Sequence, residues 1–124
     1  ILIDIDSFAD INELYGFNTG DLVLIEVAKR LNSFSEKYGV VPYRLYGNVF
    51  ALVNTTMMNF SKYDEFVSDS LKIFKEESLF IEQENLELFV NITLGISIAQ
   101  EEPIKTATIA LNRAKKSNKR FYIF

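Results

Sequence analysis

A two-residue turn sequence in the middle of the chain limits the folds that the chain can adopt. Gly47-Asn48 separates two apolar runs, residues 40–45 and 49–53. A glycine at the first position of such a pair suits the tight turn of a β-hairpin. The chain is therefore predicted to contain an antiparallel pair of strands, which excludes a fold built from helices alone.

Hydrophobic periodicity predicts the remaining elements. Residues 1–3 form a short apolar run that closes on Asp4, as in a strand buried on both faces, and residues 86–99 alternate with a period of two. A last strand is expected at residues 121–124. Helical spacing predicts helices over residues 7–15 and 21–38, from Asp64 onward, and along residues 104–114. This irregular alternation indicates a mixed sheet covered by helices.

The composition limits the chemistry that the chain can perform. Its 124 residues are expected to form one domain, residues 1–124. Cysteine and histidine are absent, which excludes disulfides, thiolate metal sites and the commonest general base. The net charge of −4 argues against a nucleic-acid surface, and no apolar run is long enough for a membrane span. Because the chain begins inside a predicted strand without a methionine, we expect it to be a piece of a longer protein.

Several segments resemble one known family in the same order along the chain. The segments are Leu2–Phe8, Ile11-Asn12, Tyr15-Gly16, Thr19-Gly20-Asp21, the hairpin with Arg44 and Ala51-Leu52-Val53, Leu94–Ala99 and Ala110–Arg120. This ordered set is similar to the GGDEF domain of diguanylate cyclases over essentially the whole chain. The resemblance implies an α/β (α+β) fold: a nucleotidyl-cyclase-like palm whose central five-stranded sheet, mixed or antiparallel, is flanked by helices.

The hairpin departs from the motif that gives the family its name. The family carries Gly-Gly, an acid, Glu and Phe, whereas this chain reads Tyr46-Gly47-Asn48-Val49-Phe50. By resemblance, Asp4 and the backbone carbonyl of Ile5 belong to a metal site whose second carboxylate is replaced by Asn48. An amide offers no charge, so Asp4 and Ile5 are expected to hold a metal only weakly.

Three further replacements affect the chemistry of the expected site. Val49 cannot accept a proton, the side chain of Tyr46 crowds a position where backbone must approach phosphate, and Ala9 stands in place of a phosphate-contacting lysine. The chain is therefore predicted to have no catalytic residues and no cyclase activity. Residues 37–40 also lack the Arg-x-x-Asp motif of product inhibition, so cyclic di-GMP is not expected to bind there.

The residues that the resemblance assigns to nucleotide binding are better preserved. Asn12 and Asp21 correspond to residues that hydrogen-bond the guanine edge, Lys115 to a phosphate-facing lysine, and Lys119 to an arginine with the same role. Structural explanations stay open beside these. Asp21 is a favourable helix N-cap, Asn12 can tie down a turn, and Asp4 and Asp6 can be remnants held by packing. The cations of a helix C-terminus need no ligand: Lys115, Lys116, Lys119 and Arg120.

These features predict a catalytically inactive GGDEF-type regulatory domain in cyclic di-GMP signalling. It is expected to bind GTP, with Mg²⁺ as the accompanying ion, and to modulate an attached domain such as an EAL phosphodiesterase or a sensory domain. The alternatives are a scaffolding or homodimerisation module with an empty nucleotide site, and residual cyclase activity. The expected location is the cytoplasm, either free or as the cytoplasmic part of a membrane-anchored protein, with no membrane contact by this domain.

Overall fold

A computed structural model of the chain describes residues 1–124 and contains one five-stranded sheet with the strand order β2-β3-β1-β6-β7. The strands are β1 (Leu2–Ile5), β2 (Val40–Tyr46), β3 (Val49–Asn54), β6 (Ile92–Ile96) and β7 (Phe121–Ile123). Strand β1 lies in the centre and pairs antiparallel with β3 and β6, β2 pairs antiparallel with β3, and β7 runs parallel to β6. The expected mixed sheet is confirmed.

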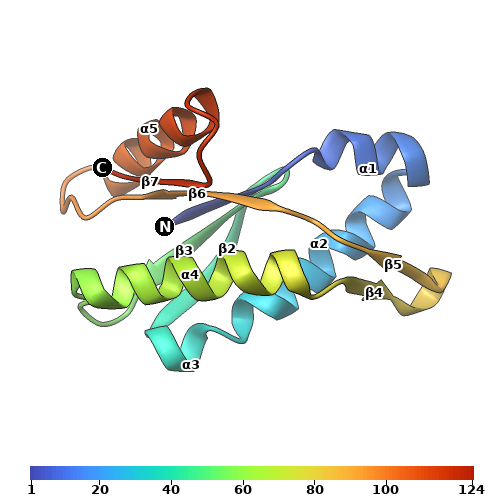
Figure 1. The fold of residues 1–124 in the computed structure, drawn as a ribbon, viewed down its shortest axis with the longest axis horizontal. Coiled ribbons are helices and arrows are strands. Elements are labelled where there is room, and N and C mark those ends of the chain that lie inside the picture. The colour runs from blue at the N-terminus through green and yellow to red at the C-terminus, as the bar shows by residue number, and fades with distance from the viewer.

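Helices cover both faces of this sheet (Figure 1). They are α1 (Phe8–Tyr15), α2 (Phe17–Asn32), α3 (Ser35–Tyr38), α4 (Phe60–Glu76) and α5 (Pro103–Lys116). The main core joins Ile3 and Ile5 of β1 to residues of α2, α3 and α4. On the opposite face, a smaller cluster joins Leu2 of β1 to Ala107 and Leu111 of α5. No helix combines the length and apolar character that spanning a bilayer requires.

Gly95 allows α5 to lie unusually close to strand β6. A Cβ atom at this position would lie 2.4 Å from the carbonyl oxygen of Ala107 and 2.4 Å from the amide nitrogen of Leu111. Only glycine leaves room for the backbone of a helix at such a distance. The small residue in the sheet and the alanine-rich face of α5 therefore fix the position of this helix, including its last turn, above strand β1.

Two predicted helix starts are wrong. Helix α2 begins at Phe17, after the N-cap residue Gly16, and not at Asp21. Helix α4 begins at Phe60, because the side chain of Asn59 accepts a hydrogen bond of 2.9 Å from the backbone N–H of Lys62. Asp21 and Asp64, which were expected to begin these helices, both lie inside them.

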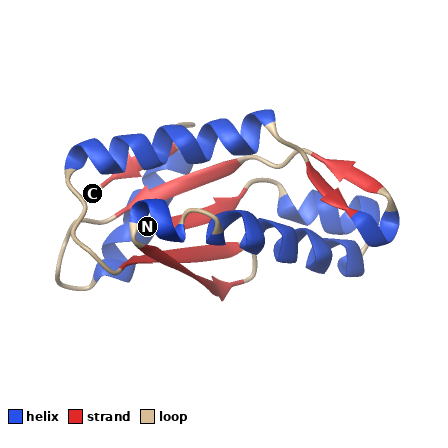
Figure 2. Cartoon of the chain, turned by 90° about the horizontal axis from the view of Figure 1, so that it is seen from below, coloured by secondary structure: helices blue, strands red, loops and turns tan.

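The predicted strand over residues 86–99 is two strands. Only β6 belongs to the main sheet, while β5 (Leu86–Leu88) pairs with β4 (Leu79–Ile81) in a separate hairpin across the 3-10 turn Glu82–Glu84. Figure 2 shows this small hairpin at one end of the long helix α4. The period-two pattern continues through both strands, so the break was invisible in the sequence, and strand β4 was missed.

Candidate functional site

The carboxyl end of strand β1 brings together residues from three distant parts of the chain. Asp4 is buried there, and the register of the sheet pairs it with Val49 on one side and Thr93 on the other. The β2–β3 hairpin turn therefore lies beside Asp4. Gly47 in this turn has a left-handed φ of 47°, as expected for the first residue of a tight turn.

Both carboxylate oxygens of Asp4 have partners within the protein. The Lys115 ammonium forms an ion pair with Oδ2, and the Asn48 side-chain amide donates a 2.5 Å hydrogen bond to Oδ1. The same Asn48 nitrogen donates a second bond of 2.8 Å to the backbone carbonyl of Ile5. The family resemblance assigned two groups to a metal, the Asp4 carboxylate and the Ile5 carbonyl. Both groups instead accept hydrogen bonds or ion pairs from nitrogen donors of the protein.

These residues do not fit a divalent cation. Hard cations such as Mg²⁺ require several oxygen ligands, and the protein contains no cluster of three or more His, Cys, Asp or Glu side chains that would hold a metal ion. The donors of Lys115 and Asn48 also direct positive charge toward the oxygens that a cation would need. The weak metal site expected at Asp4 and Ile5 therefore finds no support in this geometry.

Asp6 is bound in a similar way by a second basic residue. Arg120 forms an ion pair with Oδ2 of Asp6 at 2.5 Å, and the hydroxyl of Thr93 donates a 2.7 Å hydrogen bond to Oδ1. Two of the four basic residues near the end of α5, Lys115 and Arg120, thus neutralise the acidic end of β1. The favourable charge of the helix C-terminus is therefore not the only reason for basic residues at positions 115 and 120. The sequence showed the opposite charges but not that they meet.

The side chains at the remaining hairpin positions bring no charged group to this corner. Val49 is only 5% exposed and packs in the small cluster with Leu2, Ala107 and Leu111 under α5. Tyr46 is exposed, and Phe50 is buried in the main core. A carboxylate at position 49 would therefore face apolar groups in this chain.

Asn12 and Asp21 lie on consecutive helices, α1 and α2, and neither side chain takes part in a hydrogen bond or ion pair of the protein. Asp21 is in the second turn of α2 and exposed, so it is not an N-cap. The turn after α1 is closed by the backbone carbonyl of Asn12, which accepts from Gly16, and not by its side chain. The structural explanations for these two residues therefore fail.

Gly20 makes room for the Asn12 side chain, a role that the sequence did not indicate. A Cβ atom at Gly20 would lie 1.9 Å from Oδ1 of Asn12 and 3.3 Å from the ring of Phe8. The absent side chain leaves the space in which the Asn12 amide lies. Its only sequence signal was its place beside Asp21 in a segment that resembles the family.

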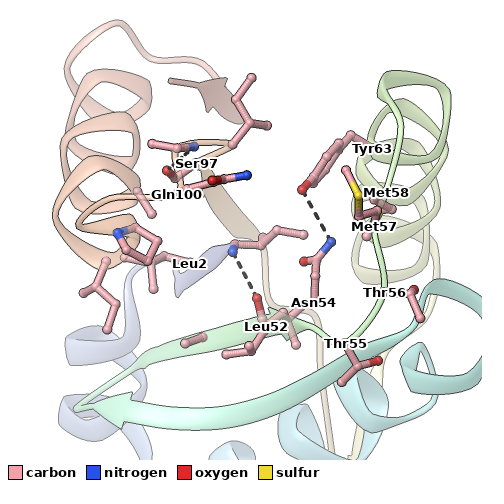
Figure 3. A pocket seen from close by; sticks show the side chains of 18 of the residues that line it. Leu2, Leu52, Asn54, Thr55, Thr56, Met57, Met58, Tyr63, Ser97 and Gln100 are labelled. Atoms are coloured by element: carbon pink, nitrogen blue, oxygen red, sulfur yellow. Dashed lines mark hydrogen bonds between the residues drawn. The ribbon is translucent and has the colours of Figure 1, made fainter.

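A sizeable hollow lies apart from these residues. It has a volume of about 710 Å³, is mostly apolar, and lies between the start of α4 and the start of α5, at the amino end of β1. Figure 3 shows Asn54 and Tyr63 facing each other across it, joined by a 3.4 Å hydrogen bond. A smaller hollow of about 310 Å³ between α2 and β2 includes Asp21 in its wall.

Residues 37–40 lack the product-inhibition motif of the family, and two of them form a charged cluster with α4. The Lys37 ammonium lies 2.8 Å from the Asp69 carboxylate and 3.3 Å from that of Glu65, and the Tyr38 hydroxyl donates to Asp69. Burial, together with the hydrogen bond to Asp69, raises the pKa of Tyr38 to about 12. The hydrogen bond from Lys37 holds the pKa of Asp69 below its usual value. The absence of cyclic di-GMP binding there stays a prediction.

Comparison with known proteins identifies the family. The family described as "Diguanylate cyclase, GGDEF domain" matches residues 1–120. The chain belongs to the GGDEF domain family. This confirms the resemblance drawn from the sequence and the palm-type fold.

Solved GGDEF structures share the fold at low sequence identity. The GGDEF domain of PA1120 (YfiN or TpbB) from Pseudomonas aeruginosa has a TM-score of 0.80 and 20% identity, covering 94% of this chain and 74% of that chain. An EAL/GGDEF domain protein from M. capsulatus has a TM-score of 0.80 and 21% identity, covering 99% of this chain and 81% of that chain.

Curated relatives are much longer than this chain. An uncharacterized membrane protein of Staphylococcus saprophyticus is 30% identical over 133 residues, which cover the whole chain and 36% of the relative. The diguanylate cyclase DgcP of Escherichia coli is 44% identical over 57 residues, which are 46% of this chain and 16% of the relative. The GGDEF domain thus corresponds to a minor part of these relatives.

Proposed function

We propose that this GGDEF domain is catalytically inactive and serves as a regulatory module in cyclic di-GMP signalling. It holds a guanine nucleotide through Asn12 and Asp21 and modulates a domain attached to it in a longer, multidomain protein. Support for an attached partner comes from relatives, which include an EAL/GGDEF protein and a diguanylate cyclase/phosphodiesterase from Caldicellulosiruptor saccharolyticus.

Loss of catalysis is supported by the contacts at the end of β1. Joining two GTP molecules requires stabilisation of the charge that develops on the departing pyrophosphate, and hard cations held by carboxylates supply it in such reactions. Here Asp4 is neutralised by Lys115, Asn48 is neutral, and Val49 lies in an apolar cluster. Asp4 and Asp6 are each paired with a basic residue, and the hairpin offers no carboxylate to hold the ion or to accept a proton.

Guanine binding is supported by the unused polar groups of Asn12 and Asp21, which is the observation that carries the proposal. The carboxylate accepts hydrogen bonds from N1–H and the 2-amino group of guanine, and the amide offers both a donor and an acceptor. Adenine has an acceptor at N1 and no 2-amino group, so Asp21 would lose both bonds. A hydrogen bond to a charged group is worth about 1.5–3 kcal/mol, so its loss corresponds to at least roughly tenfold weaker binding of ATP.

Calorimetric titration of GTP and ATP into the wild type and Asp21→Ala tests this proposal. We expect weak binding of GTP, a preference over ATP of at least roughly tenfold, and loss of that preference in Asp21→Ala. Glu13→Ala is the matched control, because Glu13 is an exposed acid on α1. Equal affinity for both nucleotides would contradict the proposal.

The scaffolding alternative is favoured by a different observation, the filled corner at Asp4. It predicts no nucleotide binding at all, together with a concentration-dependent homodimer in analytical ultracentrifugation. A parallel assay with GTP and Mg²⁺ or Mn²⁺ is expected to give no cyclic di-GMP. Product that disappears in Asp4→Ala would show residual cyclase activity instead.

A further inference from the structure

We propose that this chain supplies its own cation at the corner formed by Asp4, Ile5 and the hairpin. The Lys115 ammonium and the Asn48 amide take the positions that a metal ion would need, and together they tie α5, β1 and the β2–β3 hairpin to one another. The corner is then a structural link that takes up no divalent metal. This replaces the expectation of a weak metal site at Asp4 and Ile5.

Hydrogen bonds from Asn48 join the hairpin to the end of β1. Asn48 has a single side-chain nitrogen with two N–H groups, and these reach Oδ1 of Asp4 and the carbonyl oxygen of Ile5 at 2.5 and 2.8 Å. The backbone carbonyl of Asn48 also accepts from the backbone N–H of Ile5 at 3.1 Å. The hairpin turn is thus joined to the end of β1 by donors in both directions.

Lys115 balances the charge of Asp4. In the metal site of the family, the two negative charges of two carboxylates are balanced by a divalent cation. In this chain, the single negative charge of Asp4 is balanced by the Lys115 ammonium, and the Asn48 amide is neutral. Asn48 and Lys115 therefore complement each other: an acid at position 48 would leave an excess negative charge beside Asp4, and a neutral residue at position 115 would leave Asp4 unpaired. The side chain of Asp4 is only 7% exposed, so an unpaired charge there would be costly.

Lys115 lies in the last turn of α5, within reach of Asp4. Its side chain is 45% exposed, so its flexible stem reaches from the last turn of α5 to a carboxylate that lies deeper. Helix α5 is held close to the sheet by Gly95, which brings this last turn near β1. The ion pair thus connects residues that are 111 positions apart in the chain (115 − 4).

Mn²⁺ binding to the 124-residue chain, followed by electron paramagnetic resonance of the free ion, tests the proposal without any nucleotide. We expect no uptake by the wild type and little by Asn48→Asp, in which Lys115 still competes with the ion. The double variant Asn48→Asp/Lys115→Met should bind Mn²⁺ at least roughly tenfold more tightly than the wild type, since two carboxylates and a carbonyl then lack a cation. The matched control is Asn48→Asp/Lys119→Met, which removes an exposed lysine of the same cluster and should behave like Asn48→Asp.

Thermal unfolding gives a second measurement that does not require the double variant to fold. The midpoint of the wild type should be identical in EDTA and in Mg²⁺ or Mn²⁺, and Asp4→Asn should lower it equally in all three. Uptake of Mn²⁺ by the wild type, or a midpoint that rises with metal and loses this rise in Asp4→Asn, would overturn the proposal. Because no nucleotide is present, neither result depends on whether the domain binds GTP.

Discussion

Restoring the glutamate of the family motif at position 49 should destabilise this domain. Val49 is 5% exposed and contacts Leu2, Ala107 and Leu111 in the cluster between β3 and α5. None of these neighbours offers a hydrogen bond to a carboxylate. Val49→Glu therefore either buries an unpaired charge or moves α5 away from the sheet.

The magnitude follows from the burial of this side chain. Removing a buried valine from its contacts costs about 1.5–3 kcal/mol, and the desolvation of an ion adds several kcal/mol that a shifted pKa only partly relieves. We expect a loss of roughly 3–5 kcal/mol, which is large against the total stability of about 5–15 kcal/mol for a domain. Val53 provides a matched control, because it lies on the same strand and is 51% exposed, so Val53→Glu should cost less than about 0.5 kcal/mol.

Urea unfolding followed by circular dichroism measures both variants. Burial raises the pKa of a glutamate, so the folded state holds the proton more tightly than the unfolded state does. The loss in Val49→Glu should therefore be smaller at pH 5 than at pH 8, whereas Val53→Glu should show no such difference. Equal stability of the two variants at pH 8 would refute the reasoning and indicate that position 49 accepts a carboxylate.

Three further predictions concern other parts of the site and the fold. Asn48→Asp alone should not restore cyclic di-GMP synthesis, because catalytic groups act as a unit; a single variant with clear turnover would contradict this. Gly95→Ala should lower stability by about 1–3 kcal/mol in urea unfolding, since its Cβ would lie 2.4 Å from the carbonyl oxygen of Ala107. The hydrogen bond from Lys37 lowers the pKa of Asp69, so this pair stabilises the fold at pH values above the usual pKa of 3.8, and the stabilisation is lost as the pH falls through the folded-state pKa. Asp69→Asn should therefore make the thermal unfolding midpoint less dependent on pH in the acid range. An unchanged pH profile would argue against the ion pair.

Local sequence patterns were sufficient for the fold class and most elements. The hairpin at Gly47-Asn48, the buried first strand and the last helix were all predicted, because turn chemistry and hydrophobic periodicity act over a few residues. Helix starts were less well determined. Asn59 and Gly16 were the N-caps in place of the aspartates at 64 and 21, since several residues near each start are acceptable caps.

The sequence by itself determined which chemical groups this domain possesses. It showed that a hairpin acid and glutamate are replaced by Asn48 and Val49, and that guanine-reading residue types are present at Asn12 and Asp21. These conclusions need only residue identity, because an amide or an alkyl group cannot perform the reactions of a carboxylate at any position.

Only the tertiary structure decided how those groups are used. It showed that Lys115 and Asn48 fill the oxygens of Asp4, that Arg120 pairs with Asp6, and that the side chains of Asn12 and Asp21 are left without partners. The ion pairs join residues more than a hundred positions apart, and their formation depends on the close approach of α5 to the sheet. No local pattern records such a distance, because it is set by the packing of whole elements.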